Sequence, residues 1–124
     1  MKLVISLGSN WGDREKQIRK AIEWLNRITE KTISSSLYET PCVTGGEVSY
    51  INAVFSGESN SDLQSLSALI KEYEMKEGRD QIRRLNGEVP IDIDIVMVDN
   101  QIIKEWDYRQ HFFKIGYEEI NIKN

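Results

Sequence analysis

The sequence predicts an α+β fold, an antiparallel sheet with helices on one face. Segments with the period of two that is typical of strands alternate with segments that have the helical period of 3.6. Their order is strand, helix, strand, strand, helix, strand, which is the order of a ferredoxin-like βαββαβ sandwich. The chain has 124 residues, the length of one ordinary domain. We therefore expect a single domain over residues 1–124, with both helices on one face of the sheet and the other face open.

The spacing of apolar residues predicts the first strand and the first helix. Residues 2–8 form a strand with alternating apolar side chains, and Gly8-Ser9-Asn10 ends it with a turn. Residues 13–28 form a helix because their apolar side chains fall on one stripe. This stripe consists of Ile18, Ala21, Ile22, Leu25 and Ile28.

Two further strands are predicted at 32–40 and 48–57, on either side of a loop. The alternation in the second of these directs Ile51, Ala53 and Phe55 toward the helices, and it directs Tyr50 and Asn52 toward the open face. The loop from Pro41 to Val48 contains Gly45-Gly46, so we expect it to be mobile.

The second helix and the last strand follow at 61–76 and 91–98. Ser61-x-x-Gln64 has the pattern of a capping box, and Gly78 stands where a glycine often ends a helix. In the last strand the period of two places one set of side chains toward the helices: Ile91, Ile93, Ile95 and Met97. Asp92 and Asp94 then lie on the open face, beside Tyr50 and Asn52 if the strands are neighbours.

Composition excludes several classes of protein. Cys42 is the only cysteine and His111 the only histidine, which rules out an internal disulfide and a two-Cys, two-His zinc site. Sixteen Lys and Arg against twenty Asp and Glu give a net charge of -4, so we expect no nucleic-acid partner. An RNA-binding sheet of the same βαββαβ order is also disfavoured, because carboxylates stand where bases and phosphates would lie. No long apolar run predicts a membrane span, and we expect a cytoplasmic protein.

Asp92 and Asp94 are the strongest chemical signal in the residues themselves. Two residues apart on one strand face, their side chains start about 7 Å apart, close enough to share hard cations. Mg²⁺ is usually held by one or two carboxylates together with substrate phosphates, so the pair favours a nucleotide site. A solvated strand face is the competing interpretation, although aspartate is depleted in strands.

The basic residues that follow the second helix permit two interpretations. Arg79, Arg83 and Arg84 stand in or next to the segment Asp80–Pro90, where they would cradle a polyphosphate or simply form an exposed charged loop. The glycine-bearing stretch Gly8-Ser9-Asn10-x-Gly12 lacks the Lys-Ser/Thr ending of a Walker phosphate loop. The residues alone do not identify which side chains would bind phosphate.

Five short motifs occur in an order and spacing that resemble one enzyme family. They are Leu7-Gly8-Ser9-Asn10, Tyr38-x-Thr40-Pro41, Tyr50-Ile51-Asn52-Ala53, Glu74-x-x-x-Gly78-Arg79 and Pro90-Ile91-Asp92-Ile93-Asp94-Ile95. Each motif alone is weak, whereas the ordered set is specific. Over roughly residues 2–103 the chain resembles 6-hydroxymethyl-7,8-dihydropterin pyrophosphokinase. This resemblance implies a ferredoxin-like fold and a folate-pathway enzyme that transfers the terminal pyrophosphate of ATP to the hydroxymethyl group of a pterin.

The resemblance also implies roles on the nucleotide side. Asp92 and Asp94 correspond to the aspartates that bind two magnesium ions between the ATP phosphates and the pterin hydroxyl. Glu74 corresponds to a glutamate near the nucleotide, and Arg79 to the arginine that opens a mobile catalytic loop. By this resemblance we expect Asp92, Asp94 and Arg79 to be the catalytic residues, with ATP as a partner.

On the pterin side, Asn52 corresponds to an asparagine that hydrogen-bonds the pterin ring, and Phe112 to a phenylalanine that stacks on it. The residues expected beside Asn52 are Thr40, Pro41, Val43 and Tyr50. The resemblance thus implies a pterin as the second small-molecule partner, bound by a protein that we expect to be a monomer.

Departures from the family pattern predict reduced activity. Val89 stands where the family has a phosphate-facing arginine, Asn86 replaces a tryptophan, and Gln110 occupies another arginine position. The chain also ends at Asn124, before the family's usual C-terminal extension. Loss of an arginine clamp costs phosphoryl transfer about 10³ or more in rate. The alternative to an active enzyme is therefore a slow or non-catalytic relative that binds the pterin and the nucleotide. We expect the loops Pro41–Val48 and Asp80–Pro90 to be the most mobile parts of the free protein.

Overall fold

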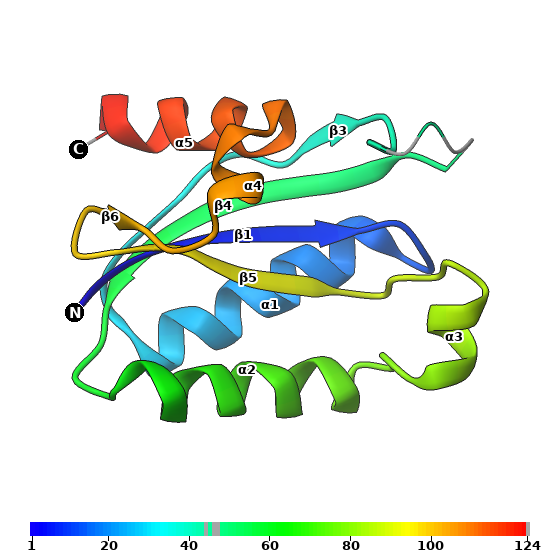
Figure 1. The fold of residues 1–124 in the computed structure, drawn as a ribbon, viewed down its shortest axis with the longest axis horizontal. Helices are drawn as coiled ribbons and strands as arrows, with labels where there is room; N and C mark the ends of the chain where they lie inside the picture. Colours follow the sequence, from blue (N-terminus) through cyan, green and yellow to red (C-terminus); the bar gives the residue numbers. More distant parts are fainter. Residues whose placement is uncertain (44, 46–47, 124) are drawn as a thin grey trace.

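A six-stranded antiparallel sheet with helices on both faces forms the framework of the protein (Figure 1). The computed structural model describes residues 1–43, 45 and 48–123. The strands are β1 (Lys2–Ser9), β2 (Glu30–Ser34), β3 (Tyr38–Thr40), β4 (Tyr50–Glu58), β5 (Asp92–Val98) and β6 (Gln101–Ile102). The helices are α1 (Arg14–Ile28), α2 (Leu63–Lys76), α3 (Gln81–Leu85), α4 (Glu105–Arg109) and α5 (His111–Lys123). The strand order is β2-β4-β1-β5-β6, and β3 also pairs with β4.

The predicted α+β fold is confirmed, and both predicted helices lie on one face of the sheet (Figure 1). The helix predicted at 13–28 begins at Arg14, because the Asp13 side chain caps it by accepting a hydrogen bond from the Lys16 backbone N–H. The predicted capping box of Ser61 and Gln64 is wrong. Asp62 is the capping residue of α2, and it accepts from the Ser65 backbone N–H at 2.8 Å.

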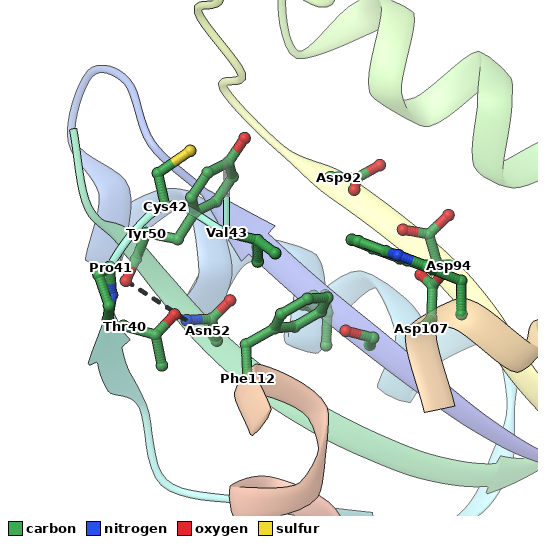
Figure 2. A pocket seen from close by; sticks show the side chains of 14 residues that line it. Thr40, Pro41, Cys42, Val43, Tyr50, Asn52, Asp92, Asp94, Asp107 and Phe112 are labelled. Atoms are coloured by element: carbon green, nitrogen blue, oxygen red, sulfur yellow. Dashed lines mark hydrogen bonds between the residues drawn. The ribbon is translucent and has the colours of Figure 1, made fainter. Parts of the chain in front are cut away.

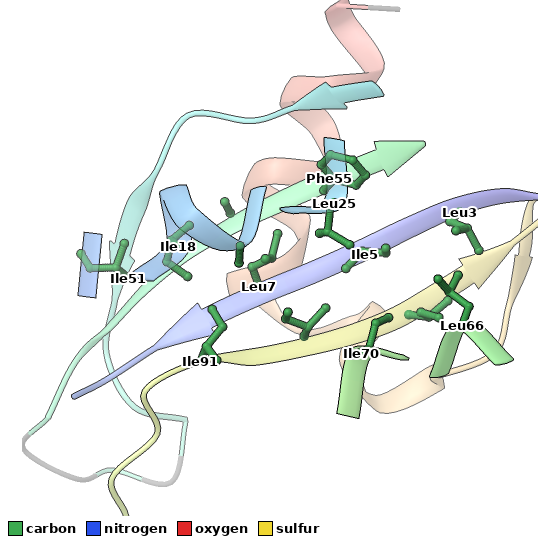
Figure 3. Packing of buried hydrophobic residues seen from close by; sticks show 14 residues of the cluster. Leu3, Ile5, Leu7, Ile18, Leu25, Ile51, Phe55, Leu66, Ile70 and Ile91 are labelled. Carbon is green, nitrogen blue, oxygen red and sulfur yellow. The ribbon is translucent and has the colours of Figure 1, made fainter. Parts of the chain in front are cut away.

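The main core lies between the sheet and the two predicted helices (Figure 3). The side chains expected to point toward the helices do so from two strands: Ile51, Ala53 and Phe55 from β4, and Ile91, Ile93 and Ile95 from the β5 segment. Each fully buried aliphatic or aromatic side chain contributes about 1.5–3 kcal/mol relative to exposure. This burial fixes the alternation of β5 and therefore places Asp92 and Asp94 on the opposite face.

The continuous strand predicted at 32–40 is wrong, because residues 35–37 separate β2 from β3. Ser35 causes the break. Its backbone N–H donates to the Val54 carbonyl at 2.8 Å, and its hydroxyl oxygen accepts from the Val54 N–H at 2.9 Å. A serine side chain thereby replaces a backbone group of the ladder, which is how serine competes with regular strand pairing. The chain then re-enters the sheet at Tyr38, opposite Asn52.

The sheet face that we expected to be open carries two helices that the sequence analysis did not predict. Helix α5 packs on β4 and β2, and α4 precedes it (Figure 1). Together with the sheet they enclose a second core of Val4, Val54, Val96, Met97, Phe113 and Ile120. Phe113, Gly116 and Ile120 have the spacing of a helical stripe, so a signal for α5 was present. Within the described part of the chain, no helix is long and apolar enough to cross a membrane.

The prediction that Met97 faces the main core is wrong because β5 contains a bulge. Val4 pairs with Met97 but Ile5 pairs with Ile95, so Val96 is an extra residue without its own partner in β1. Beyond this residue the alternation is reversed. Met97 joins the second core, and Val98 packs against the main core.

The segment Asp80–Pro90 contains a short helix instead of being an unstructured loop. Asp80 caps α3 through the Arg83 backbone N–H, and the end of the segment pairs with the turn after β1. There the Asn10 side chain accepts from the Val89 N–H at 2.6 Å and donates to the Gly87 carbonyl at 2.9 Å. The mobility of this segment stays a prediction. In the other loop, Pro41–Val48, residues 44, 46 and 47 lie outside the described residues.

Candidate active site

A cavity of about 220 Å³ lies on the sheet face that carries α4 and α5 (Figure 2). Its lining comes from four strands, the loop after β3 and the two helices: Ser6, Leu7, Gly8, Thr40, Pro41, Cys42, Val43, Tyr50, Asn52, Asp92, Asp94, Trp106, Asp107 and Phe112. Every residue expected on the pterin side and both aspartates line this cavity. Glu74 and Arg79 lie next to it, in contact with the β5 segment.

Three neighbouring strands form the floor of the cavity. Gly8 of β1 pairs with Asn52 of β4 on one side and with Asp92 of β5 on the other. A Cβ atom at Gly8 would lie 3.4 Å from Tyr50 Cδ2 and 3.5 Å from Asn52 Oδ1. Glycine at this position therefore leaves the cavity open between Asn52, which we call its amide side, and Asp92, which we call its carboxylate side.

On the amide side, Asn52 is held in a single orientation. It is 3% exposed, and its Nδ2 group donates to Thr40 Oγ1 at 2.6 Å and to the Tyr50 carbonyl at 3.3 Å. These bonds use both amide hydrogens and turn the carbonyl oxygen of the side chain toward the cavity (Figure 2). The arrangement presents a fixed hydrogen-bond acceptor to a ring that carries N–H donors.

The aromatic wall of the cavity is formed by Phe112 and Trp106, whose ring centroids are 6.1 Å apart. Tyr38 fixes the backbone of this wall, because its hydroxyl donates a hydrogen bond to the Phe112 carbonyl and accepts one from the Gly116 N–H at 3.1 Å. Burial raises the pKa of Tyr38 to about 12, so its hydroxyl stays protonated and remains a donor. A flat ring seated beside Phe112 would have an apolar face to stack on.

On the carboxylate side, each aspartate is paired with one cation. Arg79 Nη1 lies 2.8 Å from Asp92 Oδ1, and Lys104 Nζ lies 2.6 Å from Asp94 Oδ1. Burial raises the pKa of Asp92 well above its ordinary range, and the neighbouring Asp94 carboxylate raises it further. Burial alone would lower the pKa of Lys104, but the hydrogen bond and charge of Asp94 raise it overall.

Glu74 and Arg79 form the second layer behind Asp92. Glu74 Oε2 accepts from the Ile93 backbone N–H at 2.8 Å and lies 3.4 Å from Arg79 Nη1. Burial raises the pKa of Glu74, while the Ile93 hydrogen bond and the Arg79 charge act in the opposite direction. Since α2 supplies Glu74 and the residues after it supply Arg79, the end of this helix positions the cation that contacts Asp92.

The acidic pair has the chemistry of a partial magnesium site. Among the residues that the structure describes, no group of three or more His, Cys, Asp or Glu side chains is arranged to hold a metal ion. Mg²⁺ nevertheless prefers oxygen ligands and is commonly held by one or two carboxylates, with water and substrate phosphates completing its shell. Asp92 and Asp94 fit this requirement, and burial together with the neighbouring Asp94 charge raises the pKa of Asp92, so that a bound cation would favour its charged form.

Sequence reasoning missed Trp106, Asp107 and Lys104 because it assigned no structure after residue 98. All three stand in the Lys104–Phe112 stretch, from which the sequence analysis took only Phe112 and the departure at Gln110. Burial raises the pKa of Asp107, and the Asp94 charge adds to this effect. Gln110, at an expected arginine position, donates to the Trp106 carbonyl at 3.0 Å and so stabilises the end of α4. The closely spaced aromatic residues of this stretch, Trp106 and Phe112 among them, were a signal for the aromatic wall of the cavity.

Comparisons of the sequence with known proteins identify the family. The sequence model of the family described as 7,8-dihydro-6-hydroxymethylpterin-pyrophosphokinase (HPPK) matches residues 4–121. A 2-amino-4-hydroxy-6-hydroxymethyldihydropteridine pyrophosphokinase of Aquifex aeolicus is 34% identical over 101 residues, which cover 81% of this chain and 62% of the relative. A protein of the same name from Haemophilus influenzae is 30% identical, covering 81% of this chain and 64% of the relative.

A mitochondrial folate synthesis bifunctional protein of Pisum sativum is 34% identical over 98 residues, which cover 77% of this chain and 19% of that protein. The chain thus spans less than two thirds of the length of the bacterial relatives. The family model, in contrast, covers nearly all of the chain, from β1 to the end of α5, and includes every residue of the cavity. The chain belongs to the 7,8-dihydro-6-hydroxymethylpterin-pyrophosphokinase family.

Proposed function

We propose that the protein transfers the terminal pyrophosphate of ATP to the hydroxymethyl group of 6-hydroxymethyl-7,8-dihydropterin. The observation that carries this proposal is the pairing of Gly8 with both Asn52 and Asp92, which puts an amide acceptor and an acidic pair at two sides of one cavity. A pterin has ring N–H donors for the first and a hydroxymethyl arm that would extend toward the second. Family membership and the names of the bacterial relatives support the same reaction.

On the pterin side, the proposed roles are orientation and exclusion of water. Asn52 accepts a hydrogen bond from the pterin ring, in the orientation that Thr40 and the Tyr50 carbonyl impose. Phe112 stacks on the ring, and Pro41 and Val43 close the apolar edge of the cavity. Holding a reactant in the attacking geometry is worth several kcal/mol of the barrier, on the order of 7–11 kcal/mol in the most favourable cases.

On the nucleotide side, the proposed step is a displacement at the β-phosphorus of ATP. The pterin hydroxyl oxygen forms the new P–O bond, the bond from the β-phosphorus to the bridging α-oxygen breaks, AMP leaves, and the hydroxyl proton passes to solvent. Asp92 and Asp94 are the proposed ligands of Mg²⁺ with the triphosphate, by family likeness two ions. When bound, Mg²⁺ supplies neutralisation of phosphate charge and polarisation of the hydroxyl. Arg79, with Glu74 behind it, is the proposed cation at this end.

A single-turnover assay with the dihydropterin and Mg·ATP tests the proposal directly. We expect formation of AMP in step with pterin pyrophosphate, and loss of both products in Asp92→Asn and Asp94→Asn. Glu118→Gln, which neutralises an exposed carboxylate on α5, serves as the matched control and should leave transfer unchanged. Transfer that persists in both aspartate variants would overturn the metal-site assignment. Binding of both substrates without transfer would identify a non-catalytic member of the family.

The residue at position 89 offers a gain-of-function test of the same proposal. The Val89 backbone is fixed by Asn10 on both its N–H and its carbonyl, so a new side chain leaves the loop geometry intact. We expect Val89→Arg to raise the transfer rate, because a charge-assisted contact to phosphate is among the stronger hydrogen bonds. Asn86→Arg, in the same segment, is the control for the added charge alone.

The cellular setting and the assembly state are separate proposals. We propose a monomeric, cytoplasmic protein without nucleic-acid or membrane partners, and of these features the net charge of -4 supports the absence of a nucleic-acid partner. Size-exclusion chromatography with light scattering tests the monomer, and an elution mass of a dimer would contradict it.

A further inference from the structure

Lys104 is the cation in contact with Asp94, and neither the sequence analysis nor the family likeness assigns it a role. Its Nζ atom lies 2.6 Å from Asp94 Oδ1, a distance typical of a strong charge-assisted hydrogen bond. Within the described residues, no other lysine or arginine is ion-paired with Asp94. The contact places a positive charge beside the proposed metal ligands.

The backbone of Lys104 is anchored while its side chain has room to move. The Val96 carbonyl accepts from the N–H groups of Ile103 at 2.8 Å and Lys104 at 3.2 Å, and the Lys104 carbonyl accepts from the Tyr108 N–H at 3.0 Å. The side chain of Lys104 is 46% exposed. A compact ammonium on a flexible stem is therefore fixed at its base, at the edge of the cavity.

The two cations of the acidic pair differ in how firmly they are held. Arg79 contacts both Asp92 and Glu74, and its side chain is 24% exposed. Among the described residues, Lys104 is ion-paired with the Asp94 carboxylate alone, and its side chain is about twice as exposed as that of Arg79. When negative phosphates and a divalent cation bind near Asp92 and Asp94, Lys104 can exchange Asp94 for a phosphate oxygen. The same exchange by Arg79 would remove the cation from two carboxylates, Asp92 and Glu74.

We propose that Lys104 is a phosphate-binding residue that serves as the counter-ion of Asp94 until the nucleotide binds. On binding, its ammonium leaves Asp94 for an oxygen of the triphosphate, and Asp94 becomes available to the metal. The inference rests on the proposed function. It gives the site a positive charge that the neutral residues Val89 and Gln110 do not supply.

The competing interpretation is an ion pair that merely holds α4 on the sheet. Exposed pairs of this kind contribute little to stability. A structural pair and an exchanging counter-ion make different predictions for ligand binding. Removal of an exchanging counter-ion should strengthen metal binding to the free protein but weaken nucleotide binding. Removal of a structural pair should not shift these two affinities in opposite directions.

The test compares Lys104→Met, Lys104→Arg and the control Lys76→Met, which removes an exposed ion-paired lysine on α2. Calorimetry with the Mg²⁺ complex of α,β-methylene ATP measures nucleotide affinity, and competition by Mg·tripolyphosphate isolates the phosphate contribution. Electron paramagnetic resonance titration with Mn²⁺, without nucleotide, measures metal binding to the acidic pair. Tm values of all variants check folding.

In Lys104→Met we expect nucleotide and tripolyphosphate affinity to fall about ten- to hundred-fold, the range for a hydrogen bond to a charged group. Mn²⁺ affinity of the free protein should rise about two- to five-fold because Asp94 loses its competitor. Lys104→Arg should keep most of the nucleotide affinity, and Lys76→Met should match the wild type.

Nucleotide affinity that is unchanged in Lys104→Met overturns the inference, whatever the Mn²⁺ result. If the wild type binds Mg·nucleotide and transfers pyrophosphate while Lys104→Met does so equally well, only the role of Lys104 fails. If the wild type binds no Mg·nucleotide, the proposed function fails as well. The two failures are therefore distinguishable in one set of titrations.

Discussion

Tyr38 of β3 donates a hydrogen bond from its hydroxyl to the backbone carbonyl of Phe112, so a strand at the sheet edge determines where the aromatic wall of the cavity begins. The same hydroxyl accepts from the Gly116 N–H. One oxygen atom thus joins the first two turns of α5 to the sheet. Tyr38 itself does not line the cavity, yet it positions the wall on the proposed pterin side.

Tyr38→Phe should therefore affect both stability and pterin affinity. Loss of one buried hydroxyl that makes two hydrogen bonds should lower the free energy of unfolding by about 1–3 kcal/mol. Because Phe112 is positioned by this bond, KM for the pterin should rise more than KM for ATP. Urea denaturation and substrate titrations measure the two effects. Tyr117→Phe, in the aromatic cluster of the second core, is the control. An equal rise in both KM values would contradict the positioning role.

Gly116→Ala should loosen α5 by steric conflict. A Cβ atom there would lie 2.6 Å from Val54 Cγ2 and 2.8 Å from the Tyr38 hydroxyl oxygen. Such overpacking costs about 1–3 kcal/mol, since the helix must move away from β4. Thermal unfolding should register a lower Tm, while Glu118→Ala on the exposed side of the same helix should leave it nearly unchanged. A Tm equal to that of the wild type would mean that α5 repacks freely.

Gly8→Val should block the site while preserving the fold. The first added carbon meets only ordinary contacts at 3.4–3.5 Å, but a larger side chain extends into the space between Asn52 and Asp92. Valine is also well suited to a strand. We expect at least a ten-fold loss of pterin affinity in a fluorescence titration, with Gly8→Ala losing less, because each added methyl group fills more of the cavity. Pterin binding that is insensitive to both changes would place the pterin elsewhere.

Asp92→Asn should stabilise the free protein even though it removes a proposed metal ligand. Burial and the Asp94 charge raise the pKa of Asp92 in the folded state above its unfolded value of 3.8. A raised carboxyl pKa stabilises the fold at low pH, and this contribution is lost as the pH rises through the folded-state pKa. The variant escapes this loss, so its Tm advantage should be larger at about pH 9 than at about pH 5. A Tm advantage of the variant that shrinks as the pH rises would contradict a raised pKa of Asp92 in the folded state.

Glu119→Gln should have the opposite pH dependence. Hydrogen bonds from Lys123 and Ser36 lower the pKa of Glu119 to about 2 from 4.5. A lowered pKa stabilises the fold above the unfolded-state value, and the contribution disappears as the pH falls through the folded-state value. The Tm deficit of the variant should be present at neutral pH and vanish near pH 2. Because Ser36 precedes β3, this contact ties the β2–β3 connection to α5.

The sequence predicted the sheet, the two helices of the main core and the face on which Asp92 lies, because each of these depends on a local period. The break at Ser35 was not predictable in this way, since it depends on a bond between this side chain and Val54 of another strand. Ser61 fits the capping pattern as well as Asp62 does, and only the local geometry decides between them.

The residues of the cavity were predictable from a local period only where they stand on elements that have one. Residues on strands, such as Asn52 and Asp94, were placed by alternation and by family likeness. Trp106 and Lys104 were not, because α4 has five residues and therefore too short a pattern to register as a period. The backbone of Lys104 is placed by a hydrogen bond from its N–H to the Val96 carbonyl of β5, which no sequence period indicates.

The extra residue in β5 has an effect that reaches beyond the face of Met97. Regular alternation already places Asp92, Asp94 and Val96 on the face that carries α5, and the extra residue adds Met97 to that face. Because the alternation reverses only after Val96, two successive residues of β5, Val96 and Met97, contribute to the second core. The carbonyl of Val96 then receives the N–H groups of Ile103 and Lys104. The extra residue thus enlarges the apolar surface beneath α5, and its carbonyl anchors the backbone of Lys104, whose ammonium contacts Asp94.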